Sequence, residues 1–112
     1  MAKMIVLKLQ RDEARAIQGF FNYWFMLCES KSKDPEIDNS RLMWILLKSV
    51  LLQVHNKFNR RLGSFAKRFS FSFTKAEAIT LNEFLLKQPI SPDQLWHIQL
   101  RQMVINILHP QI

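Results

Sequence analysis

Residues 67–78, which read KRFSFSFTKAEA, decide the fold. Three phenylalanines alternate with an arginine and two serines, the period of two that is typical of a half-buried strand. The strand runs directly into Thr74 and Glu77, which have the spacing of a capping box and predict a helix start. A strand therefore passes straight into a helix, without a loop between them.

A similar junction opens the chain. Residues 4–9, MIVLKL, alternate in the same way and predict a short strand, followed by a helix over about residues 11–30. The apolar stripe of that helix has spacings of three and four, at Ala14, Ile17, Phe20, Phe21, Trp24, Leu27 and Cys28.

Three more helices are expected downstream. One spans about residues 40–62 and stops before Gly63; its first three turns are apolar nearly all round, which predicts a central position in the domain. The helix that starts at the Thr74 box runs to about Lys87. The last helix is predicted to start at a second capping box, Ser91-Pro92-Asp93-Gln94, and to end at Pro110.

The order of these elements is strand–helix–helix, twice. Leu7 stands 64 residues before Phe71, and the residues that follow each of them match in pattern up to a glutamate in the first helical turn. We therefore predict a mainly α fold: one four-helix domain over residues 1–112, with two short β-strands in a pseudo-repeated βαα-βαα order and half-repeats at 4–62 and 67–109. The two strands would pair with each other, antiparallel about a pseudo-twofold axis, or alternatively with those of a second copy.

The positive charge is concentrated in the middle of the chain. The net charge is +7, and residues 39–76 carry eight basic residues and no acidic one. The segments on either side are close to neutral. A one-signed segment of this length indicates an acidic partner such as nucleic acid.

Part of this charge is expected along one line of the second helix. At about 100° per residue, Arg41, Lys48, His55 and Asn59 fall within a sector of roughly 40°. Further cations fall in the last turns of that helix and around the second strand. The candidate nucleic-acid-binding residues are Lys48, His55, Lys57, Arg60, Arg61, Lys67 and Arg68. The nearby phenylalanines would provide a stacking platform only if their face of the strand were exposed, and burial under the helices is the prediction.

Catalytic chemistry is not expected. The lone cysteine, Cys28, falls on an apolar stripe and is interpreted as a packing residue, and His55, His97 and His109 lack metal-ligand spacing. With two glycines, the chain cannot form a glycine-rich phosphate loop. No cofactor, metal or small-molecule substrate is predicted. The apolar stretches are too short to span a membrane, and a cytoplasmic location is expected.

The first strand and the first helix carry more apolar residues than one buried face needs, and this favours binding to another protein chain as the function. The leading hypothesis is a non-enzymatic interaction module that forms a homodimer or binds another protein. Its candidate interface residues are Met4, Val6, Tyr23, Phe25 and Met26. The alternative hypothesis is a nucleic-acid-binding protein that uses the acid-free segment 39–76.

Overall fold

The computed structural model of the chain describes residues 4–32 and 39–112, with the backbone alone at 39 and 40, and within them it is mainly helical. Within the described residues, two strands and four helices follow one another, and a short 3-10 helix, η1, comes last. In order they are β1 (Ile5–Gln10), α1 (Arg11–Ser32), α2 (Asn39–Leu62), β2 (Arg68–Phe73), α3 (Lys75–Lys87), α4 (Leu95–Leu108) and η1 (His109–Gln111). The predicted four-helix class with two short strands is confirmed.

The two strands form an antiparallel ribbon within the chain. The register pairs Ile5 with Phe73, Leu7 with Phe71 and Leu9 with Phe69. These six side chains point to one face and are buried, as the period of two predicts. The ring of Phe58 on α2 stacks on that of Phe71 with centroids 4.4 Å apart, so α2 covers the apolar face of the ribbon.

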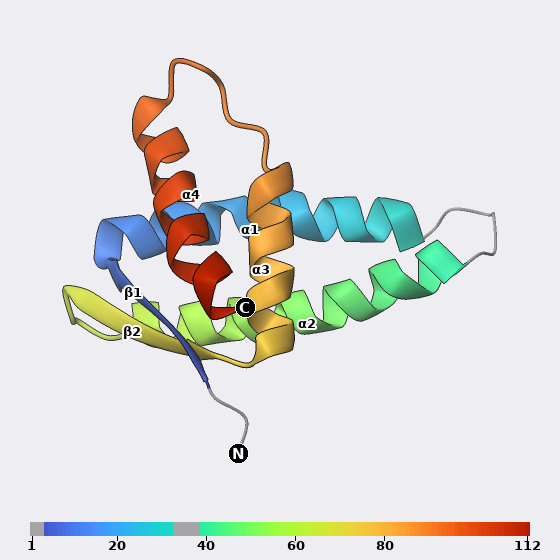
Figure 1. Cartoon of the computed structure of the whole chain (residues 1–112), viewed down its shortest axis with the longest axis horizontal. Helices are drawn as coiled ribbons and strands as arrows, with labels where there is room; N and C mark the ends of the chain where they lie inside the picture. The colour runs from blue at the N-terminus through green and yellow to red at the C-terminus, as the bar shows by residue number, and fades with distance from the viewer. Residues whose placement is uncertain (1–3, 33–38) are drawn as a thin grey trace.

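The helices supply the support that a two-stranded ribbon needs. In Figure 1, α1 and α2 form a long antiparallel hairpin, α3 crosses them near their middle, and the ribbon lies toward the end where α1 begins and α2 ends. Trp24 of α1 is fully buried and stacks on Phe84 of α3, with ring centroids 5.6 Å apart. One continuous core therefore joins the hairpin to α3 and the ribbon.

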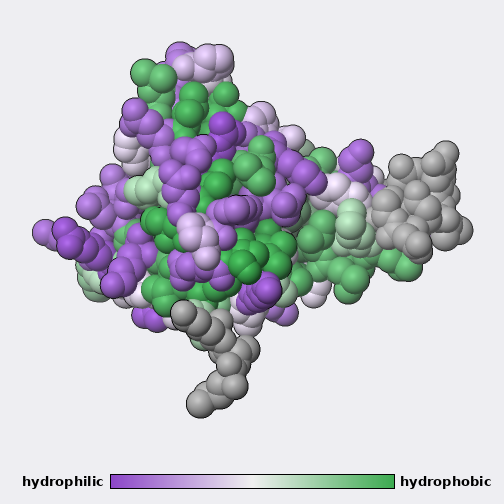
Figure 2. Space-filling view, viewed as in Figure 1, coloured by the Kyte–Doolittle hydropathy of each residue, from purple (hydrophilic) through white to green (hydrophobic). Residues whose placement is uncertain are grey.

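The helix α2 packs against α1, α3 and β2, but its apolar first turns do not lie in the core. Leu51, Val54 and Phe58, farther along the helix, are fully buried, whereas Leu42 is 61% and Leu46 67% exposed. The hairpin extends beyond α3 toward the right of Figure 1, so the first turns of α2 lie outside the main body. Side chains that were expected to fill a core instead remain on a surface, and Figure 2 shows hydrophobic residues, in green, on this part of the hairpin.

The two predicted capping boxes have different outcomes. At the start of α3 the Thr74 hydroxyl accepts from the Glu77 N–H, and the Glu77 carboxylate accepts from the Thr74 N–H, so this box is confirmed. The second box is wrong, because α4 begins at Leu95 with no side-chain cap. Residues 91–94 form a turn instead, in which the Gln94 N–H donates to the Ser91 carbonyl oxygen at 2.9 Å and the Ser91 hydroxyl donates to the Asp93 carboxylate.

The internal repeat stays a prediction. Leu7, which the offset of 64 residues matches to Phe71, is also the residue that pairs with Phe71 in the sheet. The helices of the two halves differ in length, however, with 22 and 24 residues in α1 and α2 but 13 and 14 in α3 and α4.

We expect Phe58→Ala to lower the free energy of unfolding by about 3–5 kcal/mol, because it leaves a cavity between α2 and the ribbon. Phe65→Ala is the matched control: Phe65 is fully exposed, and removing its ring should change stability by less than about 0.5 kcal/mol. Urea unfolding followed by circular dichroism measures both. Equal effects of the two substitutions would contradict the packing of Phe58 between α2 and the ribbon.

Candidate nucleic-acid interface

The polar line of α2 lies in the seam with α1 and does not form a basic surface. The Lys48 ammonium makes an ion pair with Glu29 of α1 at 3.1 Å. The His55 ring packs between Phe21 and Phe25 of α1, with centroids 4.9 and 5.5 Å away. One turn later, Asn59 accepts a hydrogen bond from Gln18 of α1.

His55 is consequently poorly placed to contact a phosphate. Its Nδ1 atom is buried without a hydrogen-bond partner among the described residues, and its Nε2 lies 3.2 Å from the Asn59 amide nitrogen. Burial lowers the pKa of the imidazole below its usual 6.5, because the charged form would lose hydration. The sequence pattern placed His55 on a basic line, but the structure makes it part of a helix–helix contact.

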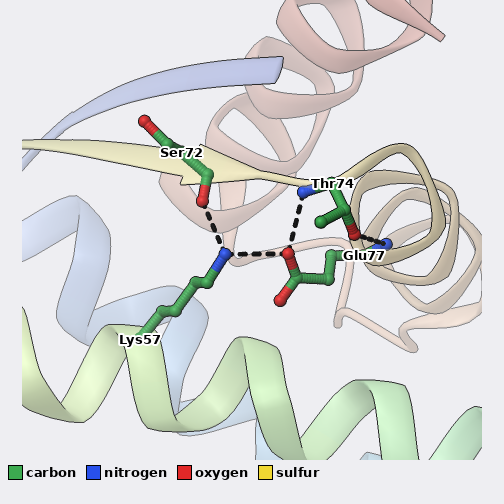
Figure 3. Close-up of polar contacts among 4 residues, drawn as sticks. All are labelled: Lys57, Ser72, Thr74 and Glu77. Carbon is green, nitrogen blue, oxygen red and sulfur yellow. Dashed lines mark hydrogen bonds and ion pairs between the residues drawn. The ribbon is translucent and has the colours of Figure 1, made fainter. Parts of the chain in front are cut away.

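Lys57 is also occupied within the fold (Figure 3). Its ammonium lies 2.8 Å from the Glu77 carboxylate, donates to the Ser72 carbonyl oxygen at 2.7 Å, and sits over the Phe73 ring. One side chain of α2 is thus joined to both β2 and the start of α3. Lys57 remains about one quarter exposed, so its charge still contributes to the surface.

The Glu77 carboxylate is nearly fully buried at this junction. Burial alone would raise its pKa, but the hydrogen bonds and positive charge of Lys57, together with the bonds from Thr74, outweigh burial and lower the pKa below the usual 4.5. The carboxylate is therefore ionised at neutral pH and paired, so it neutralises one of the eight cations of segment 39–76.

Four of the predicted binding residues gather around the end of α2 and the start of β2. Lys57, Arg60 and Arg61 line a pocket of about 390 Å³ together with Phe71 and Ser72. A second pocket, of about 520 Å³, is lined by Gln10, Arg11, Asp12, Arg15, Lys67 and Arg68. Arg60, Arg61, Lys67 and Arg68 are exposed and make no ion pair with a carboxylate of the described residues. We call these four residues the basic end.

Arg11 and Arg15 also belong to this region, and the sequence reasoning missed both because they lie in a charge-balanced segment. The Arg11 guanidinium donates hydrogen bonds to the carbonyl oxygens of Leu62, Ser64 and Ala66. The backbone N–H of Arg11 donates to the carbonyl oxygen of Lys67. A planar guanidinium can satisfy several carbonyls at once. Arg11 thereby holds the connection that carries the basic end.

No stacking platform is offered by the inward phenylalanines of β2. Phe69, Phe71 and Phe73 are at most 5% exposed, in agreement with the prediction that they are buried. Phe65, in the connection before β2, is fully exposed and is the aromatic ring available beside the basic end. The cations must therefore act largely without base stacking.

The predicted interface residues fall into two separate groups. Met4 and Val6 are exposed at the start of β1, whereas Tyr23 and Met26 are exposed on α1. Phe25 is half-buried against Phe21 and His55. The larger apolar surface is one that sequence reasoning assigned to the core, namely the exposed start of α2.

Neither a reactive cysteine nor a metal site is evident in the described residues. Cys28 is buried in the core, and burial raises the pKa of its thiol. No group of three or more metal-ligating side chains is found within residues 4–32 and 41–112. None of the described helices is both long and apolar enough to cross a membrane.

Comparisons of the chain with protein-family models, with curated proteins and with solved structures found no match in any of the three.

We expect Glu77→Gln to lower the free energy of unfolding by roughly 1–3 kcal/mol at pH 7, because Lys57 loses its buried counter-ion. The pKa of Glu77 is depressed in the folded state, so its stabilisation is present above the unfolded value of 4.5 and is lost as the pH falls through the folded value. The difference in free energy of unfolding between the wild type and Glu77→Gln should therefore become smaller toward pH 3.

Urea unfolding at several pH values measures this difference. Glu83→Gln, on the exposed side of the same helix, is the matched control and should have little effect at any pH. A difference for Glu77→Gln that stayed constant from pH 7 to pH 3 would show that the carboxylate charge does not stabilise the junction.

Proposed function

We propose that this protein binds nucleic acid through the basic end and carries no catalytic chemistry. The observation that supports this proposal is the gathering of Arg60, Arg61, Lys67 and Arg68, none of them paired with a described carboxylate. Unpaired cations on one part of a surface are suited to phosphate contacts, which provide most of the affinity of such proteins and steer association.

The electrostatic surroundings support the same proposal. Asp12 is the one carboxylate that lines either of the two pockets, where it stands among Arg11, Arg15, Lys67 and Arg68. Its Oδ1 already accepts the Glu13 N–H, as is common for an acid in a first helical turn. The local excess of positive charge is therefore large.

We expect Arg61→Glu to weaken binding to a short DNA or RNA at least about tenfold at low salt, through loss of a phosphate contact and added repulsion. Lys31→Glu makes the same change in net charge in the last turn of α1, at the far end of the hairpin, and is the matched control. If the four basic-end residues each contact a phosphate, the logarithm of the wild-type affinity should fall with the logarithm of salt concentration with a slope of roughly −4.

Fluorescence anisotropy of labelled oligonucleotides at several salt concentrations measures both quantities. Equal weakening by Arg61→Glu and Lys31→Glu would mean that net charge alone, and not the basic end, attracts the nucleic acid. An absence of binding by the wild type would refute the proposed function.

A second function, homodimerisation, is proposed from the exposed side of the α1–α2 hairpin. The half of the hairpin that is remote from the ribbon, which we call its far half, exposes apolar side chains that continue along α2. We call them the hairpin patch: Met26, Leu42, Met43, Ile45, Leu46 and Leu52. A helical hairpin with an uncovered apolar side is half of a four-helix bundle, and a second copy supplies the other half.

Charge does not oppose a second copy as the occupant, although each copy has a net charge of +7. The hairpin patch is itself uncharged, and Leu42 and Arg61 lie about 30 Å apart along α2 at 1.5 Å per residue. Two hairpins that overlap through their far halves would keep their basic ends apart, so repulsion between them would be small.

We expect Leu46→Glu to shift a dimer of the wild type to monomer, because it places a charge in the apolar contact. Leu95→Glu changes an equally exposed leucine at the start of α4 and should leave the dimer intact. Sedimentation velocity over a range of protein concentrations distinguishes the two states. A wild type that stays monomeric at high micromolar concentration would refute this second proposal.

A further inference from the structure

The outer face of the β1–β2 ribbon is polar and open to solvent. Because side chains alternate along a strand, Lys8 and Gln10 of β1 point away from the core, as do Arg68 and Ser70 of β2. All four are exposed, and the register sets Lys8 opposite Ser70 and Gln10 opposite Arg68. We call these four residues the ribbon face; Val6 and Ser72 continue it toward the start of β1.

Side chains cover both edges of the ribbon at the position where Val6 pairs with Ser72. On the β1 edge, the Gln111 amide accepts from the Val6 N–H at 3.2 Å and donates to the Val6 carbonyl oxygen at 3.0 Å. On the β2 edge, Lys57 donates to the carbonyl oxygen of Ser72, the residue paired with Val6. Further strands are hindered from adding here, so the ribbon stays two strands wide.

The surroundings of the ribbon face carry more positive than negative charge. Beside β2, Arg60 and Arg61 line the pocket with Ser72. Beside β1, α4 and η1 contain no acidic residue between 95 and 112. Glu13, at the start of α1, lines a hollow together with Lys8, Gln10, Arg68 and Ser70, and its carboxylate accepts from the Gln10 N–H at 2.8 Å. The two cations of that hollow, Lys8 and Arg68, outnumber this carboxylate.

The dimensions of this ribbon suit the major groove of B-form DNA. Two strands about 4.8 Å apart, with their side chains, fit a groove about 12 Å wide, which is known to admit a two-stranded ribbon. Successive outward side chains along a strand stand about 7 Å apart, the length of roughly two base-pair steps. Lys8 and Gln10 can therefore reach base pairs that are two steps apart.

The residue types match the hydrogen-bonding groups of that groove. Arginine and lysine donate to the O6 and N7 of guanine, glutamine pairs with the N6 and N7 of adenine, and serine serves either base. We infer that the ribbon face enters the major groove of double-stranded DNA and contacts base edges through Lys8, Gln10, Arg68 and Ser70, while Arg60 and Arg61 hold the adjacent phosphates. This inference rests on the nucleic-acid binding proposed above and assigns its substrate and its reading surface.

Double-stranded RNA is a poor fit for this surface. Its major groove is deep and narrow, so a ribbon cannot enter it. Single strands are generally bound by stacking their bases on exposed aromatic rings, and the ribbon face has none because its phenylalanines point inward. Duplex DNA is therefore the ligand that this face favours.

The test begins with selection of a preferred sequence from a pool of random duplexes by the wild-type protein. Affinities are then measured at one fixed salt concentration for the selected duplex and a scrambled one. Gln10→Ala removes an uncharged side chain that would hydrogen-bond a base edge. Arg68→Lys keeps the positive charge but loses the planar guanidinium, which donates two hydrogen bonds to one guanine. Gln53→Ala, at an exposed glutamine of α2, is the control.

We expect the wild type to prefer the selected duplex by about 100-fold or more. Gln10→Ala and Arg68→Lys should each reduce that preference about tenfold or more, with little change for the scrambled duplex, while Gln53→Ala changes neither. Replacing guanine by 7-deazaguanine in the selected duplex, which removes a major-groove acceptor, should weaken the wild type and have less effect on Arg68→Lys.

Several results would overturn the inference while leaving the proposed function intact. These are duplex binding without any sequence preference, a preference unchanged in both ribbon variants, or tighter binding to single strands or RNA than to duplex DNA. Loss of binding in Arg61→Glu alongside such a result would show that the basic end acts without the ribbon. If the wild type bound no nucleic acid at all, the proposed function itself would fail.

Discussion

The register between β1 and β2 is the constraint on which the rest of the structure depends. The two strands are far apart in the chain, and their pairing brings the start of α1 next to the end of α2. A shift of one residue would turn the phenylalanines outward and the cations inward, so burial of one face holds the register. The Phe58–Phe71 stack and the cover of α2 provide that burial.

Two charged side chains connect this ribbon to the helices, and neither acts as an isolated ion. Arg11 binds the carbonyls of the connection between α2 and β2, and Lys57 joins β2 to Glu77 at the start of α3. Each is satisfied by several partners, which offsets the loss of hydration on partial burial. The fold thus uses some of its positive charge to hold β2 and leaves the remainder at the surface.

This division separates two kinds of cation that look alike in the sequence. Lys48 and Lys57 meet glutamates from α1 and α3, whereas Arg60, Arg61, Lys67 and Arg68 meet none among the described residues. The inward phenylalanines of β2 and its outward arginine and serines arise from one alternating pattern. The same six residues therefore supply both core packing and a polar outer face.

Local patterns in the sequence were sufficient to predict the elements of the fold. Period-two alternation marked both strands, spacings of three and four marked α1, and the Thr74–Glu77 box marked the start of α3, because each depends on residues close together in the chain. The Ser91 box misled because residues 91–94 close a turn, in which the Gln94 N–H donates to the Ser91 carbonyl oxygen, and the helix begins only at Leu95.

Tertiary packing alone decided where the charges and apolar faces lie. The line through Lys48, His55 and Asn59 reads as a basic stripe, but it faces α1 because the partners of a helix face lie far away in the chain. For the same reason the apolar start of α2 looks central and is in fact exposed. The sequence by itself determined the elements and the acid-free segment; only the packing of α1 and α3 against α2 decided which cations were neutralised and which apolar side chains were left at the surface.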